Sequence, residues 1–247
     1  QLNWIRHDLT GSSQHNGVAA NTSGCSACNG YELMNDLDFD TNQDGALDSN
    51  DDYFDSDGDG SNQGWLAIGA EDAPFAAIFE GNQHSILNLY MNRSDYNSGF
   101  FARVGGSNTG LSGTIKNLSL GGDLMSVSLK GTAGALVGYL DNSVVDNCSS
   151  TGPFTASSSY SGGLVGYAEN ESIIRDSYTT GNVTGNGELG GLLGYAYNKV
   201  QVINSYATGD VSSASGYVGG LVSYIEDAVI IKNSYATGSV SANSSSV

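Results

Sequence analysis

The stretch Gly162-Gly163-Leu164-Val165-Gly166-Tyr167 decides the fold, because the chain repeats it. Variants of this stretch occupy residues 134–139, 190–195 and 219–224, so the motif recurs after 28, 28 and 29 residues. A unit of this length, made of short apolar runs between Gly, Asn and Ser, cannot bury its apolar side by itself. Stacking one unit on the next buries a continuous core, and this predicts a solenoid.

A second motif lies between the copies and favours strands over helices. Residues 173–181 read Ile-Ile-Arg-Asp-Ser-Tyr-Thr-Thr-Gly, and later copies end at Gly209 and Gly238. Runs of Val, Ile, Thr and Tyr between glycine pairs are typical of strands, and a helix would need a 3.6-residue period. We therefore predict an all-β fold, a right-handed parallel β-helix with rungs of about 29 residues stacked about 4.8 Å apart.

Equivalent positions in successive rungs should form columns along the helix. A polar residue recurs at one corner, where stacked amides can bond to one another: Asn88, Asn117, Asn147, Asp176, Asn204 and Asn233. Two apolar columns should line the interior: Leu136, Leu164, Leu192 and Leu221, and Ile115, Val145, Ile174, Val202 and Ile231.

The chain divides into two parts that we expect to form one continuous structural unit. Residues 1–64 should be an N-terminal cap with acidic loops, and residues 65–247 should form the β-helix repeats. The next glycine corner is due near position 248, just beyond Val247. This spacing predicts that the chain is a fragment of a longer repeat array, or that disorder follows this point.

Charge is distributed unevenly along the chain. The sequence has 26 acidic and 8 basic residues, a net charge of −18, and 9 of the acids lie between Asp38 and Asp59 without a base among them. This balance argues against nucleic-acid binding, which needs Lys and Arg to displace counterions. No apolar run approaches the length of a membrane span, so we expect no span in this segment.

The acidic stretch contains a pattern that predicts a calcium site. From Asp40 onward it follows D-x-[DN]-x-D-G, and a glycine at the sixth position permits the sharp turn of a Ca²⁺ loop. The expected ligands of the first loop are Asp40, Asn42, Asp44, the Ala46 carbonyl, Asp48 and Asp51, with Asp52 as an alternative to Asp51. A weaker second run supplies Asp55, Asp57 and Asp59. We expect calcium to order the cap, which requires the millimolar calcium found outside cells.

The cysteines are few. Cys25 and Cys28 form a Cys-Ser-Ala-Cys pair in a segment rich in Asn, Ser and Gly, where a local disulfide is the simplest interpretation. A redox pair and half of a zinc site are alternatives. Cys148 should be a small buried apolar residue.

The repeated Gly-Gly-Leu-Val-Gly-Tyr resembles the GLUG motif of large bacterial surface and secreted proteins, and the resemblance covers roughly residues 30–247. The upstream part is similar to the usual start of such regions, but Glu80 and Gln83 depart from the family's Asp-Gly-Asn-Gly-His, and residues 100–102 depart from its Leu-Phe-Gly. The resemblance implies a β-helical segment of a surface or secreted protein. Regions of this family occur as stalks, as adhesive segments and beside enzyme domains.

Candidate binding and catalytic groups can be placed on the repeat. Two aromatic columns could pack to fix strand register or could offer a strip for sugar rings: Tyr139, Tyr167, Tyr195 and Tyr224, and Tyr178, Tyr206 and Tyr235. Six carboxylates could serve a polysaccharide-cleaving groove, but they scatter over different repeat positions: Glu169, Glu171, Asp176, Asp210, Glu226 and Asp227. A single threonine column gives little support for ice binding: Thr151, Thr180, Thr208 and Thr237.

These observations predict a non-catalytic, calcium-stabilised segment of a secreted or cell-surface bacterial adhesin. Its partner would be a glycan or a host or cell-surface protein. The alternative is a polysaccharide-active β-helix enzyme, a lyase or a hydrolase.

Overall fold

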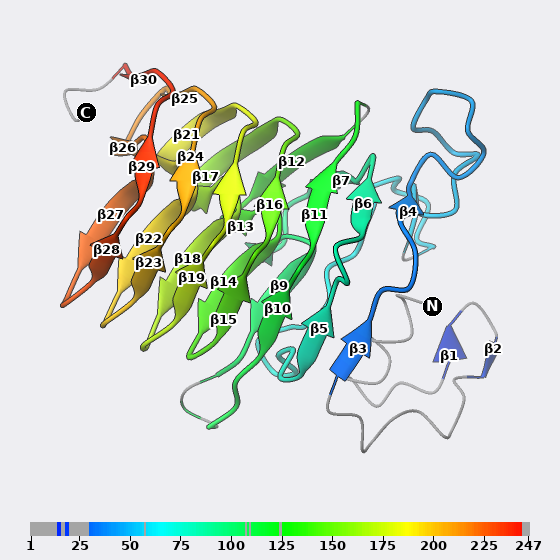
Figure 1. Ribbon diagram of the computed structural model, residues 1–247. Helices are drawn as coiled ribbons and strands as arrows, with labels where there is room; N and C mark the ends of the chain where they lie inside the picture. Colours follow the sequence, from blue (N-terminus) through cyan, green and yellow to red (C-terminus); the bar gives the residue numbers. More distant parts are fainter. Residues whose placement is uncertain are drawn as a thin grey trace.

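The computed structural model describes residues 14–15, 18–19, 30–56, 58–106, 108, 110–123 and 125–243. In this part the chain is all-β and winds as a parallel solenoid (Figure 1). A short antiparallel hairpin, β1 (Gln14–His15) and β2 (Val18–Ala19), stands apart from the four stacked sheets. The prediction of a parallel β-helix with rungs of about 29 residues is confirmed.

The chain passes through four sheets in each turn, which we number 1 to 4 in chain order. Sheet 1 has seven strands: β3 (Gly30–Glu32), β5 (Ile78–Glu80), β10 (Thr114–Lys116), β15 (Val144–Asp146), β19 (Ile173–Arg175), β23 (Gln201–Ile203) and β28 (Ile230–Lys232). Sheet 2 follows it with seven more: β4 (Leu37–Asp38), β6 (Ser85–Leu87), β11 (Ser119–Gly121), β16 (Ser149–Ser150), β20 (Tyr178–Thr179), β24 (Tyr206–Ala207) and β29 (Tyr235–Ala236).

Sheets 3 and 4 complete each turn. Sheet 3 comprises β7 (Tyr90–Arg93), β12 (Ser126–Lys130), β17 (Phe154–Gly162), β21 (Val183–Gly190), β25 (Val211–Ser213) and β30 (Val240–Ala242), with β8 (Asn97–Ser98), β13 (Thr132–Gly134) and β26 (Val218–Gly219) at its side. Sheet 4 comprises β9 (Phe101–Val104), β14 (Val137–Asp141), β18 (Val165–Glu169), β22 (Leu193–Tyr197) and β27 (Val222–Glu226). The pairs β3–β5 and β4–β6 are parallel, so residues 30–38 of the expected cap already join sheets 1 and 2.

The interior columns follow the predicted register. Ile115, Val145, Ile174, Val202 and Ile231 are direct partners across sheet 1. Leu136, Leu164 and Leu192 are fully buried, as are the first four members of the other column. Ile231, in the last described turn, is 40% exposed. Cys148 is also buried, as predicted, and desolvation raises the pKa of its thiol to about 12.

At the polar corner between sheets 1 and 2, stacked residues with a left-handed backbone conformation form a ladder. Asn117, Asn147, Asp176, Asn204 and Asn233 have φ values between 49° and 55°, a conformation that Asn and Asp tolerate better than most residues. Side-chain amides of Asn147, Asn204 and Asn233 donate to the preceding member at 2.7, 2.9 and 3.1 Å. Asp176 has no side-chain N–H, so the ladder is interrupted between Asp176 and Asn147.

The prediction that Asn88 opens this ladder is wrong. Glu80 is the partner of Lys116 in sheet 1, which places Gly81 beside Asn117, whereas Ile86 pairs with Leu120 in sheet 2. Residues 86–89 therefore lie in sheet 2 and at the corner that follows it, one corner after the one occupied by the ladder. Their Ile-Leu-Asn-Leu sequence imitates the motif, but the Asn88 amide donates to Asp38 at 2.7 Å.

The first turn has a different interior and leaves sheet 4 irregular. Trp65 stacks on Phe100 with ring centroids 5.1 Å apart, and its indole N–H donates to the Phe100 carbonyl at 3.1 Å. Isolated parallel bridges join Ile68 to Phe101 and Phe75 to Val104. Between these bridges the chain leaves the sheet as an exposed loop at residues 70–72, closed by a bond from the Ala70 N–H to the Ala73 carbonyl at 3.0 Å. This loop forms one wall of the site described below.

Candidate functional site

In the first acidic loop, backbone N–H groups donate hydrogen bonds to carboxylates of the same loop. Asp40 is 7% exposed and accepts hydrogen bonds from the backbone N–H groups of Asp44 and Gly45 at 3.1 and 3.0 Å. Asp51 is equally buried and accepts from the N–H groups of Thr41 and Asp48 at 2.7 and 3.0 Å. Burial by itself would raise the pKa of Asp51, but the backbone donors outweigh burial and lower it. The side chains at the first and twelfth positions thus close the loop by accepting hydrogen bonds from its backbone.

A cation would find only part of its coordination shell preformed here. Asn42 Oδ1 accepts from the Asp44 N–H at 2.9 Å, which brings it near the Asp40 carboxylate, whereas Asp44 is exposed and Asp48 is half-buried. Within the residues that the structure describes, no three His, Cys, Asp or Glu side chains are grouped closely enough to hold a metal ion. The oxygen donors suit Ca²⁺ chemically, and coordination would require the Asp44 and Asp48 side chains to turn inward.

The second acidic run holds an unsatisfied oxygen. Asp55 Oδ2 accepts from the Gly60 N–H at 2.9 Å, but its Oδ1 is buried and no described donor reaches it. A buried carboxylate oxygen without a donor is costly, and a cation would relieve that cost. Asp59 Oδ1 accepts from the Ser61 N–H at 2.8 Å. Asp57, and the expected disulfide between Cys25 and Cys28, lie outside the described residues.

Both tyrosine columns exist, and neighbouring rings in each column contact one another; the Tyr167–Tyr195 and Tyr195–Tyr224 pairs are tilted, and the others are stacked. Tyr139, Tyr167, Tyr195 and Tyr224 are direct partners in sheet 4. Tyr139 and Tyr167 are stacked, with centroids 4.7 Å apart and an 11° angle between the rings. In sheet 2, Tyr178, Tyr206 and Tyr235 stack at 4.9 and 5.3 Å with angles of 5° and 6°. Where the rings are stacked, their faces cover each other, so these contacts help to fix the register of neighbouring strands.

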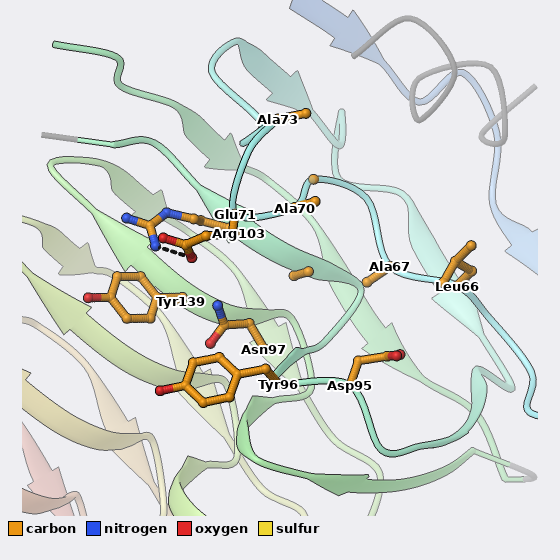
Figure 2. A pocket seen from close by; sticks show the side chains of 12 residues that line it. Leu66, Ala67, Ala70, Glu71, Ala73, Asp95, Tyr96, Asn97, Arg103 and Tyr139 are labelled. Carbon is orange, nitrogen blue, oxygen red and sulfur yellow. Dashed lines mark hydrogen bonds and ion pairs between the residues drawn. The ribbon is translucent and has the colours of Figure 1, made fainter. Parts of the chain in front are cut away.

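A pocket of about 600 Å³ lies at the N-terminal end of sheet 4. Its walls are the loop of residues 66–73, the segment of residues 95–97 that leads into β8, and the outer side of β9 and β14. Figure 2 shows Asn97 between the rings of Tyr96 and Tyr139. The Tyr96 side chain is 80% exposed, and Asn97 Oδ1 is buried with no donor from the described residues. The predicted site residues include only Tyr139 of this pocket.

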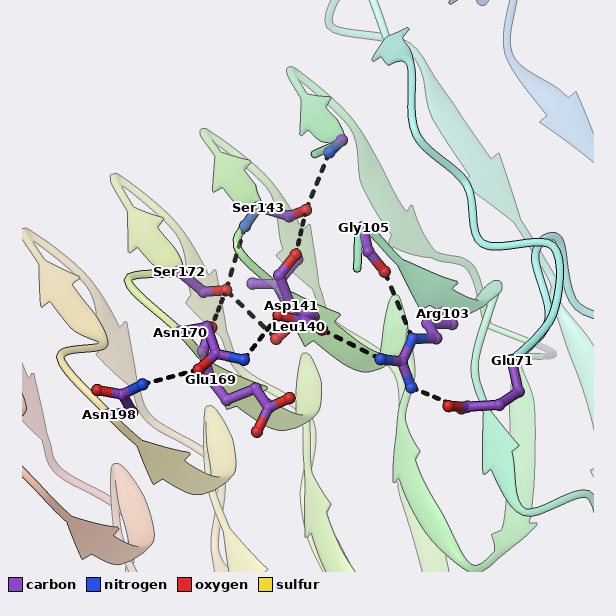
Figure 3. Close-up of polar contacts among 11 residues, drawn as sticks. Glu71, Arg103, Gly105, Leu140, Asp141, Ser143, Glu169, Asn170, Ser172 and Asn198 are labelled. Carbon is purple, nitrogen blue, oxygen red and sulfur yellow. Dashed lines mark hydrogen bonds and ion pairs between the residues drawn. The ribbon is translucent and has the colours of Figure 1, made fainter. Parts of the chain in front are cut away.

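Arg103 is held rigidly at the edge of the pocket. Its guanidinium donates to Glu71 and, at 3.1 Å, to Asp141, and it lies 4.4 Å from the centre of the Tyr139 ring. Asp141 is 1% exposed and also accepts from the Asn170 amide at 2.9 Å. The Asn198 amide in turn donates to Asn170 at 2.7 Å, so a second ladder leads along the helix to Arg103 (Figure 3).

Sequence reasoning missed this pocket and the second ladder. The signal for the ladder is the 28-residue spacing of Asn170 and Asn198. The only feature of the sequence that marks the pocket is an absence, because residues 66–73 and 95–97 do not follow the repeat. Because these two segments meet only in space, the spacing of residues along the chain gives no indication that they share a site.

Comparison with known protein families gives a match to the family described as the GLUG motif. Four stretches match it: residues 131–156, 157–184, 185–212 and 214–241. Each stretch is one turn of the solenoid and contains strands from all four sheets. Neither the search of curated proteins nor the search of solved structures found a match.

The four matches are consecutive and agree with the turns of the structure. Across the described residues there is also no helix with the length and hydropathy needed to cross a bilayer. Four successive turns of the parallel β-helix within residues 131–241 are therefore similar to the GLUG motif.

Proposed function

We propose that the chain is a non-catalytic, calcium-stabilised β-helical segment of a secreted or cell-surface bacterial protein of the adhesin type. Its function is to present a ligand-binding surface to a glycan or to a cell-surface protein. The GLUG repeats and the rigid, repetitive scaffold support this proposal.

The observation that carries the proposal is the engagement of the repeat carboxylates in contacts between rungs. Glu171 pairs with Lys199 at 3.0 Å, Asp176 accepts from Asn204, and Glu226 accepts from the Tyr195 hydroxyl. Glu169 bonds to the Tyr139 hydroxyl, and burial and this carboxylate raise the pKa of Tyr139. Carboxylates with such partners stabilise the stack, whereas glycosidases use a pair placed across the scissile bond.

Purified protein is expected to bind an immobilised glycan or cell-surface protein without consuming it. The check is a binding screen over glycans and surface-protein extracts, followed by chromatography of each bound oligosaccharide after prolonged incubation. Binding with unchanged oligosaccharide length supports the proposal. Release of shortened or unsaturated products would contradict it and favour a polysaccharide-active enzyme.

Calcium is expected to raise the melting temperature of the chain. Calcium at 100 times its dissociation constant stabilises the folded state by about 2.7 kcal/mol, which corresponds to about 5–10 °C for a chain of this size. Removal of calcium with EDTA, followed by calorimetry, measures the shift. Magnesium at the same concentration should not replace calcium, because it requires a smaller and more regular octahedral site.

Two double variants separate calcium binding from a general effect of charge. Asp40→Ala with Asp44→Ala should abolish the calcium-dependent shift, because it removes the first and fifth positions of the loop. Asp72→Ala with Asp123→Ala removes the same charge from exposed positions outside the acidic loops and should preserve the shift. If EDTA leaves the melting temperature of the unaltered protein unchanged, a structural ion is ruled out.

A further inference from the structure

The pocket beside Tyr96 combines an apolar floor with convergent polar groups. Leu66, Ala67 and Ala102 contribute apolar surface, and the volume of about 600 Å³ lies within the range of small-molecule sites. Two of its walls, residues 66–73 and 95–97, depart from the repeat, whereas β9 and β14 supply the third, so packing of the repeat alone does not account for the pocket. Both the loop closure at Ala70 and the β8–β13 pairing hold the walls in place.

Tyr96 provides an aromatic ring that stands outside both tyrosine columns and is more exposed than any of their members. Its side chain is 80% exposed, and among the described residues no other ring packs against it. By contrast, Tyr139 has Arg103 on one side and Tyr167 on the other. An exposed tyrosine at the mouth of a pocket has one apolar face and one polar tip, which suits a ligand with C–H and O–H groups.

Hydrogen-bonding groups of the pocket are fixed before a ligand arrives. Asn97 Oδ1 is a buried acceptor with no donor from the described residues, so a ligand hydroxyl that donates to it replaces a missing bond. Arg103 is only 11% exposed and is held by Glu71, Asp141 and the Tyr139 ring, which fixes the Glu71 carboxylate at the rim. Preorganised groups of this kind reduce the cost of ordering on binding.

The charges at the pocket are matched in pairs. Asp95 is paired with Arg93 at 2.9 Å, and Glu71 with Arg103. A cationic ligand would have to compete with the two arginines for these carboxylates. An anionic ligand would approach a chain whose net charge is −18. The pocket therefore favours an uncharged ligand that donates hydrogen bonds.

We propose that this pocket binds one ring of a neutral glycan, with the sugar face against Tyr96 and a hydroxyl donated to Asn97 Oδ1. The inference rests on the proposed ligand-binding function and names its site and ligand class. The pyranose ring combines an apolar C–H face with several hydroxyl donors, which matches the single free aromatic face and the buried acceptor.

The test is isothermal titration of the full chain with maltotetraose, cellotetraose, laminaritetraose and mannotetraose. Trigalacturonic acid and chitosan tetramer serve as the acidic and cationic probes. At least one neutral oligosaccharide should bind, and Tyr96→Ala should weaken that binding by about tenfold or more, as truncation of a central tyrosine commonly does. Asn97→Leu keeps the side-chain size and removes the acceptor, so it should weaken binding about tenfold without lowering the melting temperature.

Tyr217→Ala is the matched control. Tyr217 is 49% exposed and packs against Tyr224, away from the pocket, so its loss should leave the affinity unchanged. Neutral-glycan binding that survives both pocket variants would overturn this site while leaving the proposed function intact. Binding of only the charged probes would overturn the neutral ligand class. No binding of any oligosaccharide would overturn the inference, and the surface-protein screen would then decide the proposed function separately.

Discussion

Leu164→Ala is expected to lower the free energy of unfolding by about 2–5 kcal/mol, the range for a buried leucine truncated in a well-packed core. Leu164 is fully buried between Leu136 and Leu192 of the neighbouring rungs. The chain cannot easily collapse into the resulting cavity, because parallel hydrogen bonds fix the rung spacing on both sides. The Leu164 N–H donates to the Leu192 carbonyl at 3.1 Å, and the Leu164 carbonyl accepts from Leu136 at 3.1 Å.

Leu221→Ala provides the matched control for this prediction. Leu221 occupies the same repeat position in the last described turn but is only partly buried. Its truncation removes less buried area and leaves a smaller cavity, so the loss should be less than half that of Leu164→Ala. Urea denaturation followed by circular dichroism measures both variants. Equal losses would contradict the idea that burial between two rungs sets the stability of this column.

Asn147→Val is expected to lower the free energy of unfolding by about 2–3 kcal/mol. Asn147 has a φ of 51°, a left-handed conformation that Asn tolerates but that costs a β-branched residue such as Val about 1–2 kcal/mol. The substitution also removes the bond from the Asn147 amide to Asn117 at 2.7 Å, worth about 0.5–1.5 kcal/mol.

Asn147→Gly separates the two contributions. Glycine adopts positive φ without steric cost, so only the hydrogen bond and some backbone entropy are lost, about 1 kcal/mol in total. The measurement is again the urea midpoint. If the glycine variant loses as much stability as the valine variant, the amide ladder and not the backbone conformation dominates at this corner.

Regular parts of the fold could be predicted because their signals are local and repeated. The spacing of Leu164, Leu192 and their equivalents places each in the same position of successive turns, and burial of those positions needs no further information. The same reasoning failed at Asn88, where a short apolar-Asn-apolar sequence imitates the motif. Only the pairing of Glu80 with Lys116 and of Ile86 with Leu120 shows the correct register.

For the candidate sites too, the sequence predicted some features and the structure was needed for others. The acidic loop was recognisable because its residues are close in sequence, and the structure shows Asp40 and Asp51 closing it. The tyrosine columns were also recognisable, but the direction of their ring faces depends on contacts between rungs, which the repeat spacing does not specify.

The sequence by itself determined that this chain stacks as a β-solenoid, because residues about 29 positions apart share one chemistry and can bury it only together. Only the tertiary structure decided where the surface forms a pocket. The pocket joins Glu71, Tyr96 and Tyr139, which no repeat relates to one another. Two segments that depart from the repeat form this pocket against β9 and β14, and their mutual positions depend on packing between parts of the chain that lie far apart in sequence.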